Sequence, residues 1–358
     1  MITGDQERKL AVWTPELSDI NGQNIITRRV VNNQGRFLDS VYEYRGGSLA
    51  TIPSTLWKAI RLFLSVLFGR HAGVYLVCSR SSVGFLRDVL PLATSRFGSR
   101  VVVHVHGSDL PELLERPVIG RFARWLYASC EIVVPSQHLL APLARHSFRQ
   151  LSVCENFADA PAAFGTQSKT QRQGAFVVLW NSNVMASKGI SELVEGLRLL
   201  RQEGVLIELI VLGKAIADAE RSVGEMRDFL ESLNREKWID VKGSVPPKEV
   251  PQLVAASDII ALPSTYSSEC QPLAVIQGML AGRLVMVTDT PAMRSTVGDY
   301  PAIFVGRNSG SIAQALRQLL QRRPGHAEWE AASQSRYRFS PDRFDSCIRH
   351  ALAGGDVS

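Results

Sequence analysis

Cysteine is scarce in this sequence of 358 residues, and it follows no pattern. The five cysteines are Cys78, Cys130, Cys154, Cys270 and Cys347. Their odd number, wide scatter and lack of a Cys-x-x-Cys pair exclude a disulfide framework and a zinc site of the usual spacing. We expect reduced thiols that fill the core of a protein in a reducing cytoplasm.

Long hydrophobic runs are also missing. The longest apolar stretch, residues 62–68, is too short to span a bilayer and has Lys58, Arg61 and Arg70 close to it. The N-terminus has no basic start, apolar middle and small-residue cleavage site, as a signal peptide would. The sequence therefore predicts a cytoplasmic protein without a transmembrane helix.

The net charge of +6 is not spread evenly along the chain. Residues 1–165 hold 18 Lys and Arg against 13 Asp and Glu, and residues 166–358 hold 22 against 21. No dense basic run with interleaved aromatics accompanies the N-terminal excess, which disfavours a nucleic-acid partner. A phosphate-bearing substrate or contact with the anionic inner face of a membrane fits better.

The composition, 45% hydrophobic and 21% charged, is that of a globular protein, and the length favours two domains. Short apolar, β-branched runs alternate with amphipathic stretches, which predicts buried parallel strands between helices. The predicted strands lie near residues 10–14, 40–44, 73–79, 100–106, 131–136, 151–156, 176–183, 207–213, 239–245, 259–264, 284–289 and 302–306. A polar stretch at 158–174 separates two such series. We therefore predict two Rossmann-like α/β domains, 1–165 and 166–335, and a C-terminal segment 336–358 whose helix starts at Pro341 and packs back on the first domain.

Ligands of doubly wound sheets bind beyond the carboxyl ends of the strands, so residues that follow strands are the candidates for a site. In the first half these are His106, which precedes Gly107 in an HGSD loop ending at Asp109, and Gly22 with Gln23 after the first strand. A strand-end histidine is more often structural than functional when it stands alone. The region around Gly22 lacks the three spaced glycines of a dinucleotide-binding fingerprint, which disfavours nicotinamide and flavin cofactors.

In the second half, two strand ends carry polar residues. Lys188 precedes Gly189 and a helix, and a lysine beside free helix N–H groups favours an anion site, although a solvated loop lysine is equally plausible. Glu269 precedes a helix that starts near Pro272 and carries Gln277 on its second turn, facing the site if Leu273 and Ile276 pack inward. Taken alone, Glu269 is better explained as a charge at a helix N-terminus.

Together these motifs resemble glycosyltransferase family 4, the retaining enzymes of the GT-B fold. The resemblance covers nearly the whole chain and is carried by the Ser182–Gly189 loop, the strand end LPSTYSSECQP, the turn AGRLVMVTD, the segment GFLRDVL and the HGSD loop. It implies two domains that face each other across a cleft, with a nucleoside-diphosphate sugar as co-substrate, no further cofactor and no metal.

The resemblance also implies roles for residues. Lys188 would grip the donor diphosphate, Glu269 would hold the sugar, His106 would contact the transferred sugar, and Gly22 and Gln23 would approach the diphosphate. The remaining predicted donor-binding residues are Asp109, Asn183, Cys270, Gln271, Pro272, Leu273 and Gln277. Three positions depart from the family: Asn183 replaces a common arginine, Gln277 the second glutamate and Cys270 a common glycine. Because Gln277 lacks the negative charge of the family's glutamate, donor binding should be weaker by roughly 1 kcal/mol.

The predicted function is transfer of a sugar, with retention, to a hydroxyl acceptor, such as a lipid-linked glycan in cell-surface polysaccharide assembly. Residues Trp57, Ile60, Leu64, Leu67 and Phe68 could form one face of a membrane-binding helix, but a core helix of the first domain is the stronger alternative. Two other functions stay open: a sugar-nucleotide binding protein with weak or no activity, and a GT-B epimerase or phosphorylase.

Overall fold

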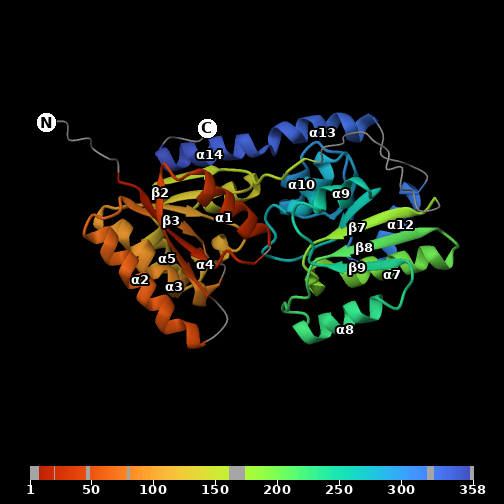
Figure 1. Ribbon diagram of the computed structural model, residues 1–358, viewed down its shortest axis with the longest axis horizontal. Helices are drawn as coiled ribbons and strands as arrows, with labels where there is room; N and C mark the ends of the chain where they lie inside the picture. The colour runs from red at the N-terminus through yellow and green to blue at the C-terminus, as the bar shows by residue number, and fades with distance from the viewer. Residues whose placement is uncertain are drawn as a thin grey trace. The chain divides into compact units, whose positions relative to one another are not determined.

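The computed structural model describes residues 8–19, 21–45, 49–78, 81–160, 174–320 and 326–354, and Figure 1 shows their secondary structure. The chain divides into two compact units, the first formed by residues 1–156 with 342–358 and the second by residues 157–341. The domain boundary predicted after residue 165 lies outside the described residues.

The first unit is built on a six-stranded sheet with the order β2-β1-β3-β4-β5-β6, in which the neighbouring strands run parallel. The strands are β1 (Leu10–Pro15), β2 (Leu38–Tyr44), β3 (Gly73–Val77), β4 (Arg100–His104), β5 (Glu131–Val134) and β6 (Gln150–Val153). The strand β3 is buried along its whole length because helices cover both faces of the sheet.

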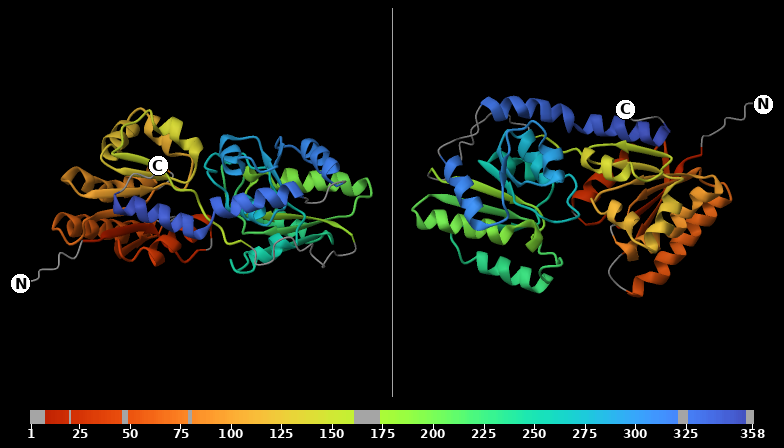
Figure 2. Two further views of the ribbon diagram at one scale, coloured as in Figure 1. Left: turned by 90° about the horizontal axis from the view of Figure 1, so that it is seen from above. Right: turned by 180° about the vertical axis from the view of Figure 1, so that it is seen from behind.

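Most helices of this unit connect its parallel strands, and α14 joins it from the end of the chain. They are α1 (Gly22–Asn33), α2 (Ile52–Leu67), α3 (Ser82–Ala93), α4 (Leu110–Glu115), α5 (Ile119–Tyr127), α6 (Leu140–Leu143) and α14 (Pro341–Ala353), with short 3-10 turns η1 (Leu49–Thr51), η2 (Thr94–Phe97) and η3 (Gln137–Leu139). Helices α1 and α14 cover one face of the sheet, and α2, α3 and α5 cover the other (Figures 1 and 2).

Helix α14 is the last helix of the chain and yet belongs to the first unit. Arg29 on α1 donates two hydrogen bonds of 2.8 Å to the Asp345 carboxylate, and Asn33 donates a third of 2.9 Å. The side chains of Phe344, Ile348 and Leu352 are buried beneath the helix. The helix begins at Pro341, the residue at which the sequence predicts it to begin.

The second unit has its own six-stranded sheet, with the order β12-β11-β10-β7-β8-β9 and parallel neighbours. Its strands are β7 (Phe176–Asn181), β8 (Ile207–Leu212), β9 (Ile239–Gly243), β10 (Ile259–Leu262), β11 (Leu284–Thr288) and β12 (Ile303–Val305). The order reverses between β7 and β10, so this pair is the topological switch point of a doubly wound sheet. All the strands predicted from the sequence are confirmed in both units.

Two layers of helices enclose this sheet. They are α7 (Ile190–Gln202), α8 (Val223–Leu233), α9 (Val250–Ala255), α10 (Leu273–Leu280), α11 (Pro291–Val297), α12 (Ser309–Leu319) and α13 (His326–Arg338), with a 3-10 turn η4 (Ala186–Lys188). Helices α7 and α12 lie side by side, and a Cβ on Gly196 would come within 3.0 Å of Ile312. Across the described part of the chain, no helix has both the length and the apolar character needed to cross a membrane.

Candidate functional site

Lys188 and Glu269 meet at the switch point of the second sheet. Lys188 ends the η4 turn that follows β7, and Glu269 lies in the loop that follows β10. Because β7 and β10 are neighbours, their carboxyl ends bring the two loops together. The Lys188 Nζ atom lies 3.1 Å from Glu269 Oε2, and the two side chains are only 12% and 13% exposed.

Gly189 permits this close approach. Its φ of +82° lies in the left-handed region, where a side chain is strained. A Cβ at this position would stand 2.4 Å from the carbonyl oxygen of Pro263 at the end of β10. Glycine is therefore needed both for the turn into α7 and for the contact between the two loops.

Hydroxyl groups complete the surroundings of the ion pair. Lys188 Nζ donates a 2.9 Å hydrogen bond to Ser182 Oγ, and Ser264 Oγ donates one of 3.3 Å to Glu269 Oε2. The ring of Tyr266 lies with its centroid 5.7 Å from the ammonium. A cation, a carboxylate and two hydroxyls thus share one small region, which can hold an anion and a polyol together.

Helix α10 places Gln277 beside the end of β7. The Asn181 side chain donates a 2.6 Å hydrogen bond to Gln277 Oε1. Ile276 is fully buried, as the prediction required, but Leu273 is half-buried and lies one turn before Gln277 on the same face. Asn181 is a site neighbour that the sequence did not reveal, because the predicted strand runs to residue 183 whereas β7 ends at Asn181.

The residues between Glu269 and α10, which were predicted to bind the donor, are almost completely buried. Cys270 is 2% exposed and Gln271 is 4% exposed, so their side chains offer little surface to a ligand. Pro272 is also buried and has the extended backbone of an N-cap residue, and α10 begins at Leu273, one residue from the predicted start. Asn183, in the loop after β7, is half-buried.

The predicted residues of the first unit follow two of its strands. Gly22 is the exposed first residue of α1 after β1, and Gln23 follows it. His106 follows β4, its ring centroid lying 4.3 Å from that of His104, and Asp109 directly precedes α4. Thus His106 and Asp109 share one loop, whereas Gly22 and Gln23 belong to another.

Two histidines near this loop, His104 and His138, have lowered pKa values. Burial lowers the pKa of His104 to about 3, and its Nδ1 lies 2.6 Å from the Tyr75 hydroxyl oxygen. His138 has a pKa lowered by burial, and its Nε2 lies 3.1 Å from Ser108 Oγ. Both rings are therefore neutral at pH 7.

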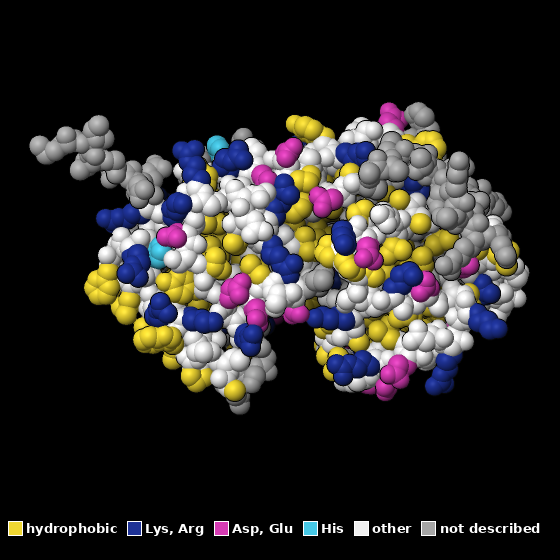
Figure 3. Space-filling model, viewed as in Figure 1, with side chains coloured by type: hydrophobic (Ala, Val, Ile, Leu, Met, Phe, Trp, Pro, Cys, Tyr) yellow, Lys and Arg dark blue, Asp and Glu magenta, His cyan; other side chains and the backbone are white. Residues whose placement is uncertain are grey.

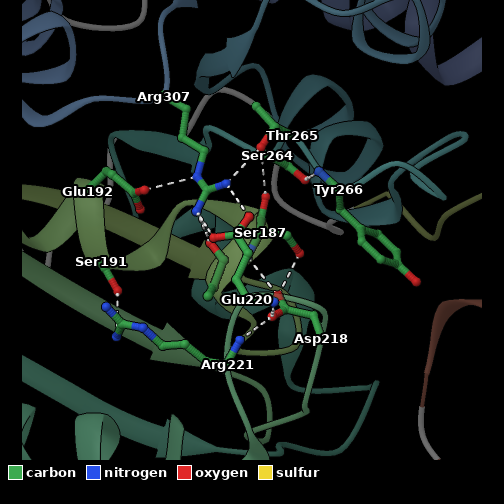
Figure 4. A network of polar contacts seen from close by, with 11 residues as sticks. Ser187, Ser191, Glu192, Asp218, Glu220, Arg221, Ser264, Thr265, Tyr266 and Arg307 are labelled. Carbon is green, nitrogen blue, oxygen red and sulfur yellow. Dashed lines mark hydrogen bonds and ion pairs between the residues drawn. The ribbon is translucent and has the colours of Figure 1, made fainter. Parts of the chain in front are cut away.

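Arg307 is a central residue of the second unit that the sequence analysis missed. It follows β12 and donates hydrogen bonds to Glu220 at 2.6 Å, to Thr265 Oγ1 at 2.9 Å and to the Ala186 carbonyl at 2.8 Å (Figure 4). Its Nε also lies 3.0 Å from Glu192. The hydrogen bonds to Glu220 raise the pKa of Arg307. The guanidinium therefore joins the η4 turn, α7 and the loops after β8 and β10.

Asp218, in the loop after β8, holds the same turn from the other side. Its Oδ2 accepts hydrogen bonds of 2.7 Å from both the N–H and the hydroxyl of Ser187, the residue before Lys188 (Figure 4). Burial alone would raise the pKa of Asp218, but hydrogen bonds from Ser187, Arg221 and Glu220 outweigh it and lower the pKa to about 2. The rule that residues after strands form the site points to Arg307, which closely follows β12, whereas Asp218 lies farther along the loop after β8.

The described residues contain no group of three or more His, Cys, Asp or Glu side chains arranged to hold a metal ion.

Comparison with known proteins agrees with this geometry. Residues 175–322 match the family described as glycosyl transferases group 1. The chain is 24% identical over 199 residues, 53% of its length, to the lipopolysaccharide 1,2-N-acetylglucosaminetransferase of Salmonella typhimurium, and the match spans about half of that relative, 49%.

Solved structures resemble nearly the whole chain. HepE of Anabaena, in complex with UDP and glucose, has a TM-score of 0.74 at 16% identity, with 96% of this chain and 99% of that chain covered. Sucrose-phosphate synthase of Thermosynechococcus elongatus has a TM-score of 0.70 at 14% identity, with 97% and 100% covered.

The two doubly wound units, each with a parallel six-stranded sheet, define an α/β protein of the GT-B glycosyltransferase fold. Within this fold, the sequence similarity to a known family lies in the second unit, whose residues 175–322 match the glycosyl transferases group 1.

Proposed function

We propose that the protein is a retaining glycosyltransferase that moves a hexose from a nucleoside-diphosphate sugar to a hydroxyl acceptor. The observation that carries this proposal is the contact between Lys188 and Glu269 at the switch point of a group 1 glycosyl transferase unit. A donor needs a cation for its diphosphate and an acceptor of hydrogen bonds for its sugar hydroxyls. The pair supplies both.

The mechanism follows from where charge develops. As the bond between the sugar and the diphosphate breaks, negative charge grows on the leaving phosphate, and an ammonium already in place stabilises it without reorganisation. Lys188 has this role, and Ser182 orients its Nζ. Glu269, held by Ser264, accepts hydrogen bonds from the sugar hydroxyls. The donor replaces the contact between the two side chains with contacts to itself.

The first unit supplies the remaining groups of the proposed reaction. His106 contacts the transferred sugar, with Asp109 nearby, and the backbone at Gly22 and Gln23 approaches the diphosphate. The His106 ring lies tilted against the neutral His104 ring, with the two centroids 4.3 Å apart. No metal takes part in this scheme, in which the Lys188 ammonium offsets part of the charge on the leaving group, so we expect a metal chelator to leave the rate unchanged.

The comparisons support a choice of substrates. HepE binds UDP and glucose, and the Salmonella relative is a lipopolysaccharide N-acetylglucosaminetransferase. We therefore propose a UDP-hexose as the first donor to test. The acceptor we propose is a lipid-linked glycan in cell-surface polysaccharide assembly, at the cytoplasmic face of the membrane.

A second candidate function is favoured by Gln277. This position carries a neutral amide, and its oxygen already accepts a hydrogen bond from Asn181. This arrangement favours a sugar-nucleotide binding protein of the same fold that has no transferase activity. A donor that binds tightly while no sugar is transferred to lipid-linked or saccharide acceptors would favour this second function.

The test is a thermal-shift panel of UDP-, GDP- and ADP-sugars. A ligand at one hundred times its Kd stabilises the folded protein by about 2.7 kcal/mol, so one nucleotide class should raise the Tm clearly. Lys188→Ala should weaken this shift and lower kcat/KM at least about tenfold. If no nucleotide raises the Tm, the proposed donor site is wrong.

Lys242→Ala is the matched control for this variant. Lys242 also pairs with a carboxylate of the second unit, Asp240, at 2.8 Å, but on the more exposed strand β9. Lys242→Ala should leave both the donor-induced Tm shift and kcat/KM as they are in the wild type. Retention is tested by NMR of the first product, whose anomeric configuration should equal that of the donor.

A further inference from the structure

Helix α2 is apolar on two faces. Thr55, Ala59, Leu62 and Val66 form the face buried against the rest of the first unit. The residues predicted to form a membrane-binding face lie elsewhere: Trp57 is 61% exposed, Leu64 40%, Leu67 46% and Phe68 80%, while Ile60 is half-buried. The core-helix alternative is therefore confirmed for the buried face, and the residues predicted for a membrane-binding face are mostly exposed.

The exposed apolar surface continues onto neighbouring elements. Leu86 on α3 is 60% exposed, Phe97 on η2 is 62% exposed, and Trp125 on α5 is 50% exposed. The ring of Phe63 on α2 packs edge-on against Phe97 at 5.7 Å. The guanidinium of Arg96, also on η2, lies 4.4 Å from the Trp125 ring centroid. These contacts make α2, α3, η2 and α5 one continuous surface, here called the apolar-basic face.

The charges on the apolar-basic face have one sign. Arg61, Arg96 and Arg121 are exposed on it. Its single acidic residue, Asp88, is completely buried and pairs with Arg87 at 2.9 Å. Carboxylates lie on the adjoining elements: Glu112 on α4 pairs with Arg116 at 2.8 Å, and the half-buried Glu43 lies on β2, where its carbonyl accepts a hydrogen bond from Lys58 of α2.

The second unit does not share this property. Its exposed large hydrophobic residues are isolated on separate elements, as in Leu206, Phe304 and Tyr337. In the first unit, hydrophobic side chains gather with Lys and Arg along the edge where α2 lies (Figures 1 and 3). A soluble protein seldom leaves so large a contiguous patch bare, so the apolar-basic face is an interaction surface.

We propose that the apolar-basic face docks on an anionic lipid surface. Trp57, Phe68, Phe97 and Trp125 would enter the boundary between head groups and acyl chains, which favours aromatic rings. Arg61, Arg96 and Arg121 would pair with lipid phosphates. A second copy of the chain fits less well because it would set these guanidinium groups against one another.

This inference gives a surface to the membrane contact in the proposed function, but it does not depend on the chemistry of the donor site. The test uses the full chain and vesicles of phosphatidylcholine alone or with an equal amount of phosphatidylglycerol. We expect the protein to float with the anionic vesicles, to bind the neutral ones much more weakly, and to be released by salt.

Two variants separate the apolar and the basic contributions. The double variant Trp57→Ser with Phe68→Ser should lower the partition coefficient on anionic vesicles at least tenfold. Arg61→Gln with Arg96→Gln should lower it and weaken its salt dependence. The matched control is Leu206→Ser with Tyr337→Ser, which removes two equally exposed hydrophobic residues from the second unit and should bind as the wild type does.

The same variants distinguish a failure of membrane binding from a failure of donor binding. Circular dichroism and the Tm shift with the sugar nucleotide should stay unchanged in each of them, so membrane binding can fail while donor binding holds, and the reverse. Absence of vesicle binding would overturn the proposal. So would an equal loss in the control variant, or a lipid-free dimer that Trp57→Ser with Phe68→Ser dissociates.

Discussion

Asp218 illustrates how a single carboxylate positions the candidate site by holding the turn that carries Lys188. It accepts hydrogen bonds from the backbone and the hydroxyl of Ser187, directly before Lys188. The ionised form is favoured because the lost hydration is replaced by these N–H and O–H donors. A protonated Asp218 would accept fewer hydrogen bonds, and the turn that carries Lys188 would be held less firmly.

The depressed pKa gives Asp218 a defined dependence on pH. Its pKa is about 2 in the folded protein against 3.8 for the model compound, so its ionised form stabilises the fold above pH 4 and this contribution is lost as the pH falls toward 2. Asp218→Ala should lower the free energy of unfolding by about 2 kcal/mol at pH 7. The difference from the wild type should stay constant down to about pH 5 and shrink below pH 4.

Urea unfolding at a series of pH values measures this difference. Asp299→Ala, at an exposed position between α11 and β12, is the control and should change stability little at any pH. A difference between Asp218→Ala and wild type that does not vary between pH 7 and pH 3 would contradict the assignment of the stabilising contacts to the ionised carboxylate.

At this scale the sequence predicts some site residues and not others, for a physical reason. Lys188 and Glu269 each follow a strand, and the family motif selects them among the other residues that follow strands. Arg307 also follows a strand, but its partners at Ala186 and Glu220 are 121 and 87 positions away. Such distant partners cannot be inferred from the sequence, so an arginine that joins several loops cannot be distinguished from a solvated one. The burial of Cys270 was equally hidden.

At the scale of elements, Gly189 links a strand end to a helix start. Two constraints act on it: a positive φ, and the Pro263 carbonyl 2.4 Å from where a Cβ would stand. Gly204 has a similar φ of +87° but nothing within 4 Å of its Cβ position. The two glycines therefore differ in crowding while sharing the same backbone strain.

We expect Gly189→Ala to lower the free energy of unfolding by roughly 3 kcal/mol, from backbone strain and overpacking together. Gly204→Ala should cost only about 1 kcal/mol, because strain acts there alone. Gly189→Ala should also weaken the donor-induced Tm shift, since the Lys188 turn must move. Chemical denaturation measures the first effect, and equal losses in the two variants would show that the loops are not tightly packed.

The strands were predictable because they are buried on both sides. Parallel strands covered by two helical layers appear as continuous apolar runs, such as GVYLV in β3 and LVMVT in β11. Short helices such as α4 and α9, each of six residues, are harder to predict because they are too brief to show a helical period. The apolar surface of α2 was ambiguous for a different reason: its sequence has apolar residues on more than one side of the helix, so only the fold identifies the side that is exposed.

At the scale of the whole chain, the first unit is closed by residues from both ends of the sequence. Residues 1–156 form its sheet, and α14 returns after the second unit to cover one face. Arg100 at the start of β4 also donates to the carbonyls of Ala351 and Leu352, at the last turn of that helix. A cation is favourable there because free carbonyl groups gather at a helix C-terminus. The first unit therefore cannot be complete until the chain has been synthesised to its final helix.

Ending the chain after Ser340 tests this dependence. The truncation removes Phe344, Ile348 and Leu352, each about 2% exposed or less, and leaves Arg29 without Asp345. Loss of three buried apolar side chains, at about 2 kcal/mol each, takes away roughly 6 kcal/mol, a large share of the stability of a domain of this size. Hydrogen exchange should therefore rise in peptides from β1 to β6 and stay slow in those from β7 to β12. Asp345→Ala, which removes one contact of the same helix, should give the same pattern with a loss of only about 2 kcal/mol. If the truncated chain protects both sheets equally well, α14 is not part of the first unit's cooperative core, and the helix can be removed without cost to the sheet it covers.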